Sequence, residues 1–126
     1  MTIAIDLSQL ITADAKAADA LAADRDRIKA RRDMAIASGI TVAGMALATD
    51  DLSQSRIMGA ALSAMLDPGY SVQWKIAAGF VTLSAPQVIA IASAIRAHVQ
   101  ACFDREAQLL AALDAGDPVD IETGWP

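Results

Sequence analysis

The sequence predicts an α+β fold, in which a long N-terminal helix and a long C-terminal helix flank a small antiparallel ββαββ unit, followed by an extended tail. Residues 12–38 and 85–115 are rich in alanine and contain no glycine, a composition that favours helix. Between them, short stretches alternate hydrophobic and polar residues with the period of a β-strand. Because 126 residues support a single core, we expect residues 1–38 (an N-terminal strand and helical arm), 39–84 and 85–126 to form one folding unit.

The beginning of the chain predicts a short strand. Residues 2–7 place Ile3, Ile5 and Leu7 on one face, and Ala4 and Asp6 on the other. Six residues do not form a stable strand alone. The segment is therefore either a frayed terminus or a strand that adds to the edge of a sheet in a partner chain. On the second interpretation, Ile3, Ile5 and Leu7 are candidate partner contacts.

Residues 12–38 predict a helix with few large hydrophobic side chains. Thr12 is a suitable N-cap and Gly39 a suitable C-terminal stop. The apolar stripe is narrow and consists of Ala17, Leu21, Ile28 and Ala35. We therefore expect a partner along one narrow face, as in a coiled coil or a long helical hairpin.

Two segments predict β-hairpins. Residues 39–49 alternate around a turn at residues 43–44, and residues 71–83 alternate around a turn at residues 78–79. The simplest arrangement joins both hairpins into one small sheet with one face covered.

A helix over residues 52–66 is predicted between the hairpins, because its apolar residues keep helical spacing. Gly59 lies in its middle, where glycine weakens a helix, so we expect a close approach of the sheet at this position. Arg56 follows Asp50 and Asp51 closely, and we expect it to form a salt link or cap network with them.

The C-terminal helix has the most informative pattern. Ser84 is its expected N-cap, and Gly116 follows its expected end. A heptad seam runs along it, formed by Val88, Ala92, Ile95, Val99, Cys102, Glu106, Leu109 and Leu113. The seam is filled either by other copies of the chain or by the helix of residues 12–38, and Glu106 needs a partner if it lies in a core.

The tail, residues 119–126, carries no helix signal but contains Trp125. A large aromatic side chain of this kind is expected to pack on the domain or on a partner. Together with Ile3, Ile5 and Leu7, three residues of the C-terminal part are candidate partner contacts: Leu109 and Leu113 of the heptad seam, and Trp125 of the tail.

Composition excludes several classes of function. One cysteine excludes a disulfide framework and a thiolate-rich zinc site. A net charge of −5 argues against nucleic-acid binding, although Arg25, Arg27 and Lys29 lie in a short basic stretch diluted by aspartates. The N-terminus does not have the pattern of a secretory signal, and no stretch is long and apolar enough to span a bilayer. We therefore expect a protein made in the cytoplasm, without nucleic-acid or membrane partners.

Few residues suggest chemistry. His98 and Cys102 lie four residues apart on one helical face, a spacing compatible with a Cys–His nucleophile. Cys102 also falls in the apolar seam, which favours a buried structural role. The aspartates at 24, 26, 50 and 51 are explained by helix caps and a solvated face. We therefore expect no catalytic, cofactor-binding or metal site and no enzymatic activity.

Residues 25–126 resemble an uncharacterised domain of tailed phages and prophages that occurs in or beside tail-fibre and tail-fibre-assembly proteins. The matching motifs are Arg31–Arg32, Gly39–Ile40, Thr49–Asp50–Asp51 with Ser53, Ser55–Arg56–Ile57, Gly59–Ala60, Val72–Gln73–Trp74–Lys75, residues 80–83, residues 89–99 and the closing residues 121–126. Residues 1–24 lie outside this resemblance.

The resemblance implies a structural protein of the virion tail, as a component of, or attached to, a tail fibre or baseplate protein. It transfers no catalytic residues. A transient fibre-assembly chaperone is the alternative, and an enzyme using Cys102 and His98 is a remote one. The heptad seam adds the expectation of a homo-oligomer.

Overall fold

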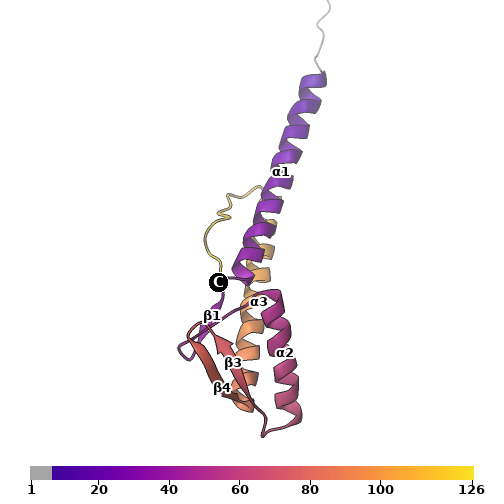
Figure 1. Ribbon diagram of the computed structural model, residues 1–126. Coiled ribbons are helices and arrows are strands. Elements are labelled where there is room, and N and C mark those ends of the chain that lie inside the picture. The colour runs from indigo at the N-terminus through magenta and orange to yellow at the C-terminus, as the bar shows by residue number, and fades with distance from the viewer. Residues whose placement is uncertain (1–6) are drawn as a thin grey trace, which may run out of the picture.

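Two antiparallel helices of 30 residues form the frame of the molecule, α1 (Leu7–Ile36) and α3 (Ala85–Asp114). The computed structural model describes residues 7–126, with side chains from Thr12 onward. The helices lie side by side over part of their lengths, and α1 then continues alone past the end of α3 (Figure 1). The predicted α+β order of elements is confirmed.

Helix α3 follows its predicted pattern closely. Ser84 and Gln87 form a reciprocal capping box at its start, and Pro86 occupies the first turn, where a missing N–H costs no helical hydrogen bond. All seven apolar residues of the predicted seam are buried, and Glu106 is partly buried beside Arg32. The seam is filled within the chain, by α1 at one end and by α2 (Asp51–Leu66) at the other.

The two predicted hairpins form, but they do not join into one sheet. Strands β1 (Ile40–Val42) and β2 (Met45–Leu47) pair with each other, as do β3 (Ser71–Ile76) and β4 (Gly79–Ser84). The prediction of one continuous sheet was wrong because β1 and β2 have only three residues each, and each hairpin instead contacts α3 separately.

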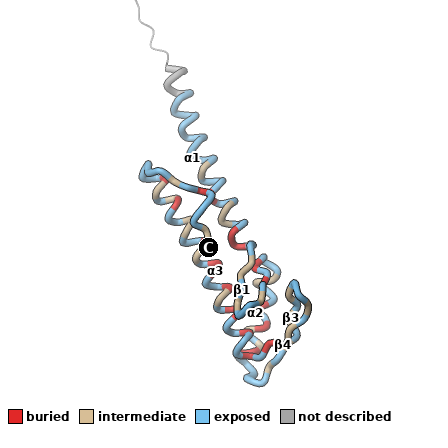
Figure 2. The backbone as a smooth tube through the Cα atoms, turned by 90° about the vertical axis from the view of Figure 1, so that its left-hand side faces the viewer, coloured by how far each residue is buried: buried red, intermediate tan, exposed pale blue. Residues whose placement is uncertain are grey.

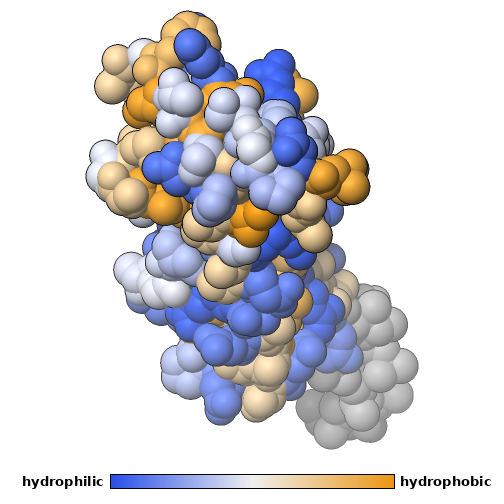
Figure 3. Space-filling model, turned by 90° about the horizontal axis from the view of Figure 1, so that it is seen from below, coloured by the Kyte–Doolittle hydropathy of each residue, from blue (hydrophilic) through white to orange (hydrophobic). Residues whose placement is uncertain are grey.

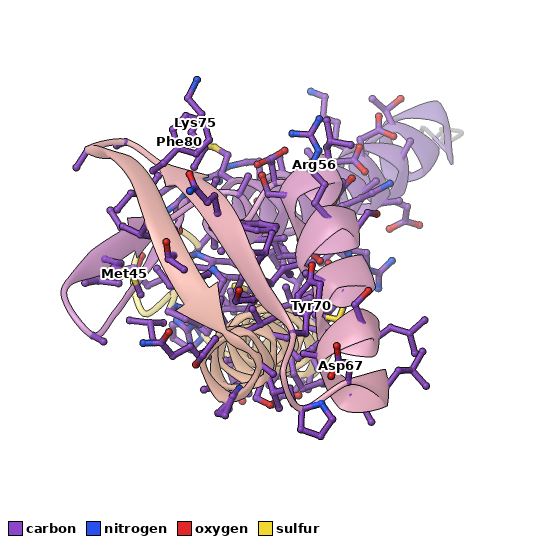
Figure 4. The ribbon with its side chains drawn as sticks, turned by 60° about the horizontal axis from the view of Figure 1, so that its bottom comes forward. Met45, Arg56, Asp67, Tyr70, Lys75 and Phe80 are labelled. Atoms are coloured by element: carbon purple, nitrogen blue, oxygen red, sulfur yellow. The ribbon has the colours of Figure 1, made fainter. Side chains whose placement is uncertain are left out.

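Helix α2 packs on α3 through Ile57, Ala60 and Ala64. Gly59 lies on the outer face, and a Cβ added there would meet no atom within 4 Å. The expected close approach of a sheet at Gly59 was therefore wrong. Figure 4 shows Arg56 extending outward from α2.

The end of α1 is held by side chains from other elements. Thr49, which is fully buried, donates from Oγ1 to the carbonyl of Ile36 and accepts from the amide of Gly39 at 2.9 Å. His98 Nε2 lies 2.9 Å from the carbonyl oxygen of Ala35, which can only accept, so this nitrogen is the donor. These bonds satisfy carbonyls that the end of any helix leaves unpaired.

Buried residues form two clusters (Figure 2). The larger lies between α2, α3 and the hairpins, and extends to Ala35 and Ile36 at the end of α1. The smaller consists of Ile28, Leu109, Leu113 and Ile121. Within residues 7–126, no helix is long and apolar enough to cross a membrane.

Candidate interaction site

Helix α1 changes character along its length. Ile28, fully buried, is the first buried residue among its described side chains, and Arg25 pairs with Asp114 in the last turn of α3 at 2.6 Å. Residues 7–24 therefore lie beyond the end of α3; we call this segment the arm. At 1.5 Å per residue it is about 27 Å long.

The arm is exposed on every described side. Residues 12–23 are all exposed, including Leu21 at 41%. Figure 2 shows this part of α1 as an unbroken exposed tube. Of the predicted stripe, Ile28 and Ala35 are buried, whereas Ala17 and Leu21 are not, because α3 ends before it reaches them.

The C-terminal tail, residues 117–126, leaves the end of α3 and runs back along the paired part of the molecule, so that the C-terminus lies near the end of α1 (Figure 1). Glu122 pairs with Arg27 and Arg31 of α1, in each case at 3.2 Å. From α3, Arg105 donates to the carbonyls of Asp120 at 3.3 Å and Thr123 at 3.0 Å. The tail therefore connects α1 and α3 within their paired part, next to the base of the arm.

The predicted partner contacts in the C-terminal part lie together, within this chain. Leu109 and Leu113 are buried with Ile28 and Ile121, and Trp125 packs partly buried against both clusters. The indole of Trp125 donates to the carbonyl of Ile121 at 2.7 Å. Packing of Trp125 on the domain is thus confirmed, whereas Leu109 and Leu113 are covered within the chain, in part by Ile121 of the tail.

The predicted contacts near the N-terminus lie elsewhere. Ile3 and Ile5 are outside the described residues. Leu7 is the first residue of α1, so the predicted strand was wrong at that position, where the chain is already helical.

Cys102 and His98 lie close together but are poorly arranged for nucleophilic catalysis. Cys102 Sγ is 3.9 Å from His98 Nε2, and that nitrogen already donates to the carbonyl of Ala35. Cys102 is fully buried, and this burial raises the pKa of its thiol above the ordinary value. An activated nucleophile requires the opposite shift and access for a substrate.

Of the aspartates at 24, 26, 50 and 51, Asp50 is the N-cap of α2. The Asp50 carboxylate accepts from the amide and hydroxyl of Ser53 at the start of α2. The cap at this place is formed by Asp50 and Ser53, without a direct bond from Arg56. Among the described residues, no ion pair joins Arg56 to Asp50 or Asp51, although the Ser53 hydrogen bonds, and to a smaller extent the charge of Arg56, lower the pKa of Asp50. Within the same part of the chain, no three His, Cys, Asp or Glu side chains gather into a possible metal site.

The sequence pattern did not reveal an apolar outer face on α2. Leu52, Leu62, Met65 and Leu66 are each more than half exposed. Beside them, Ala64, Pro68, Pro86 and Ile89 line part of a shallow groove of about 380 Å³. The end of the molecule opposite the arm carries several hydrophobic side chains among hydrophilic ones (Figure 3). The signal in the sequence that could have revealed this apolar face is the spacing of Leu52, Leu62 and Leu66, which places them on one side of the helix.

Comparison with known proteins gives a family but no function. Residues 8–123 match a family described as a domain of unknown function (DUF4376). No curated protein and no solved structure shows significant similarity to the chain. The match includes residues 8–24, so most of the arm lies within the extent of the family domain.

Proposed function

Because the chain belongs to the DUF4376 family, a domain of unknown function, we propose its function from its motifs and its exposed surface. It is a structural protein of a phage tail, part of or attached to the tail fibre or baseplate, and it acts through protein–protein contacts. The motifs of residues 25–126 support the association with phage tails, and the arm supports the mode of action.

The exposed arm is the observation that carries this proposal. A helix gains most of its stability from packing along one face, and isolated helices of this length are marginal in water even when rich in alanine. The arm nonetheless continues α1 past the end of α3, with residues 12–23 exposed. A helix of the fibre protein, or the arm of a second copy, would supply the missing packing surface.

The composition of the arm suits a helical partner. Its described surface is dominated by alanine, and small side chains let two helix axes approach closely. Leu21 provides one larger apolar contact, 41% exposed. Charged residues are few and mainly acidic: Asp14, Lys16, Asp19 and Asp24.

The decisive experiment combines particle composition with co-expression. Mass spectrometry of purified phage particles should detect the protein, and co-expression with the neighbouring fibre gene should yield a complex. A complex without the protein in particles would replace the structural role with that of a transient assembly chaperone. A monomer that neither enters particles nor binds the fibre protein contradicts both.

A matched pair of variants locates the contact. Leu21→Asp places a charge on the arm and should weaken the complex, because burying that charge is unfavourable. Leu52→Asp introduces the same change on α2, where Leu52 is 57% exposed, and should leave the complex intact. Light scattering of the free protein shows whether the arm also mediates self-association.

A further inference from the structure

The tail holds much of its shape through bonds within itself. The Asp120 carboxylate accepts from the amide of Glu122 at 3.1 Å and from the hydroxyl of Thr123. The Trp125 indole bonds back to the carbonyl of Ile121. A segment stabilised by its own short-range bonds can move as a unit, as compact surface loops do.

The attachment of the tail to the helices is limited and lies near the surface. Ile121 is the one buried residue among positions 117–126. The ion pair between Glu122 and Arg27 is exposed, with 60% and 57% of the two side chains accessible. Ion pairs in this setting are weak and are screened by salt. Arg31, which binds the Glu122 carboxylate and carbonyl, is more shielded at 25%.

The tail covers an apolar surface that the helices do not cover themselves. Ile121 packs on Ile28, Leu109 and Leu113, which line the junction of α1 and α3 at the base of the arm. The helices have separate contacts further along, where Arg32 bonds Glu106 and His98 bonds the carbonyl of Ala35. These contacts involve no tail residue, so α1 and α3 can stay paired when the tail leaves.

We propose that residues 117–126 form a releasable strap, which opens as one unit while α1 and α3 remain paired and thereby exposes Ile28, Leu109 and Leu113. This is a property of the free chain, and it holds whichever partner the arm binds.

Gly124 provides a specific way to open the strap. Its φ is +80°, and a Cβ at this position would lie 2.8 Å from Nη2 and 2.9 Å from Cζ of Arg105. Gly124→Ala therefore displaces the guanidinium that bonds the tail carbonyls. Gly44→Ala is the matched control, because Gly44 has a φ of +79° and no atom within 4 Å of the added Cβ.

The experiment uses Trp125 as the reporter in a Trp74→Phe background. Gly124→Ala should increase acrylamide quenching of Trp125 by at least about twofold, as expected for local opening, while circular dichroism shows the same helix content. Amide hydrogen exchange should accelerate at residues 117–125 and remain unchanged in α3 at residues 85–102. High salt screens the exposed ion pair of Glu122 with Arg27 and should likewise increase the quenching of Trp125.

Two outcomes overturn the strap. In one, Trp125 becomes accessible only at the denaturant concentration that melts the helices; in the other, Gly44→Ala opens the tail as much as Gly124→Ala does. If Gly124→Ala does not fold, the pair Arg31→Gln and Arg96→Gln replaces it. Arg31 binds Glu122, whereas Arg96 is an exposed arginine of α3 away from the tail, so the first alone should raise quenching.

Discussion

Arg32 on α1 and Glu106 on α3 form an ion pair that is largely shielded from solvent. Arg32 Nη1 donates to both carboxylate oxygens at 2.9 Å, and the two side chains are 16% and 15% exposed. Partial burial opposes the charge of Arg32, but hydrogen bonds to Asp33 and Glu106 outweigh it and raise the pKa of the guanidinium. The centroid of the Phe103 ring lies 4.9 Å from Cζ of Arg32.

Replacing Arg32 by Met should destabilise the fold strongly, because the Glu106 carboxylate would keep its partial burial and lose its partner. We expect a loss of about 3 kcal/mol in the free energy of unfolding, measured with urea. Arg25→Met is the control, since its pair with Asp114 is exposed and should cost less than about 1 kcal/mol. Equal losses in both variants would contradict this role of burial.

Replacing Thr49 by Val should lower the free energy of unfolding by about 2 kcal/mol. Valine has nearly the same shape as threonine but lacks the hydroxyl, so the backbone groups of Ile36 and Gly39 that bond it would be buried and unpaired. Thermal unfolding measures the loss. The same substitution at Thr41, exposed on β1, should be close to neutral. A neutral Thr49→Val would mean that water replaces the hydroxyl.

Gly59→Ala should stabilise the protein by about 1 kcal/mol, the usual difference between these residues within a helix. The added Cβ meets no atom of the chain. The melting temperature of the isolated protein should rise by about 4 °C. A variant that is more stable alone but no longer assembles would show that a partner approaches α2 closely at Gly59.

Stability should fall in acid, partly through Asp50. The hydrogen bond from the Ser53 hydroxyl lowers the pKa of Asp50, with the Ser53 amide adding to the effect. A carboxyl group with a lower pKa in the folded chain stabilises it above the unfolded value, and this contribution disappears as pH falls through the folded value. The Asp50→Asn variant lacks the charge at every pH. Its loss of unfolding free energy relative to wild type should therefore shrink as the pH falls below about 5. A difference in unfolding free energy that does not change with pH would contradict this role of the Asp50 charge.

Cys102 should react with thiol reagents only as fast as the protein unfolds. It is fully buried, and its thiol has a raised pKa, so little thiolate is accessible. Ser93→Cys in a Cys102→Ser background places a thiol at an exposed position of the same helix and should react rapidly. Rapid labelling of wild-type Cys102 would revive the Cys–His hypothesis.

Local signals explain why α3 was predictable and the arrangement of α1 was not. Ser84, Gln87 and Gly116 specify the ends of α3 by caps, and its heptad spacing specifies a buried face wherever the partner comes from. For α1, the same spacing continues past Ile28 to Leu21, and the sequence does not show that α3 stops beside Arg25.

The packing of Trp125 was predicted, but the path of the tail over the helices was not, for a different reason. Its contacts join residues distant in sequence, and two of them use backbone carbonyls, which any residue provides. Residues 121–126 form a recognisable motif, but their geometry comes from Arg105, Arg27 and Arg31. The separation of the two hairpins likewise depends on how each packs on α3.

Helix α1 is continuous from the arm into the body, so it acts mechanically as a lever. A tilt of about 10° at its base would move the tip of a 27 Å arm by about 5 Å. A load applied to the arm would reach the exposed Arg25–Asp114 pair first, then the Arg32–Glu106 pair and the bonds at Ala35 and Ile36. The base of the arm is thus held by exposed ion pairs, and the more firmly held part of α1 lies further along, at Arg32, Ala35 and Ile36.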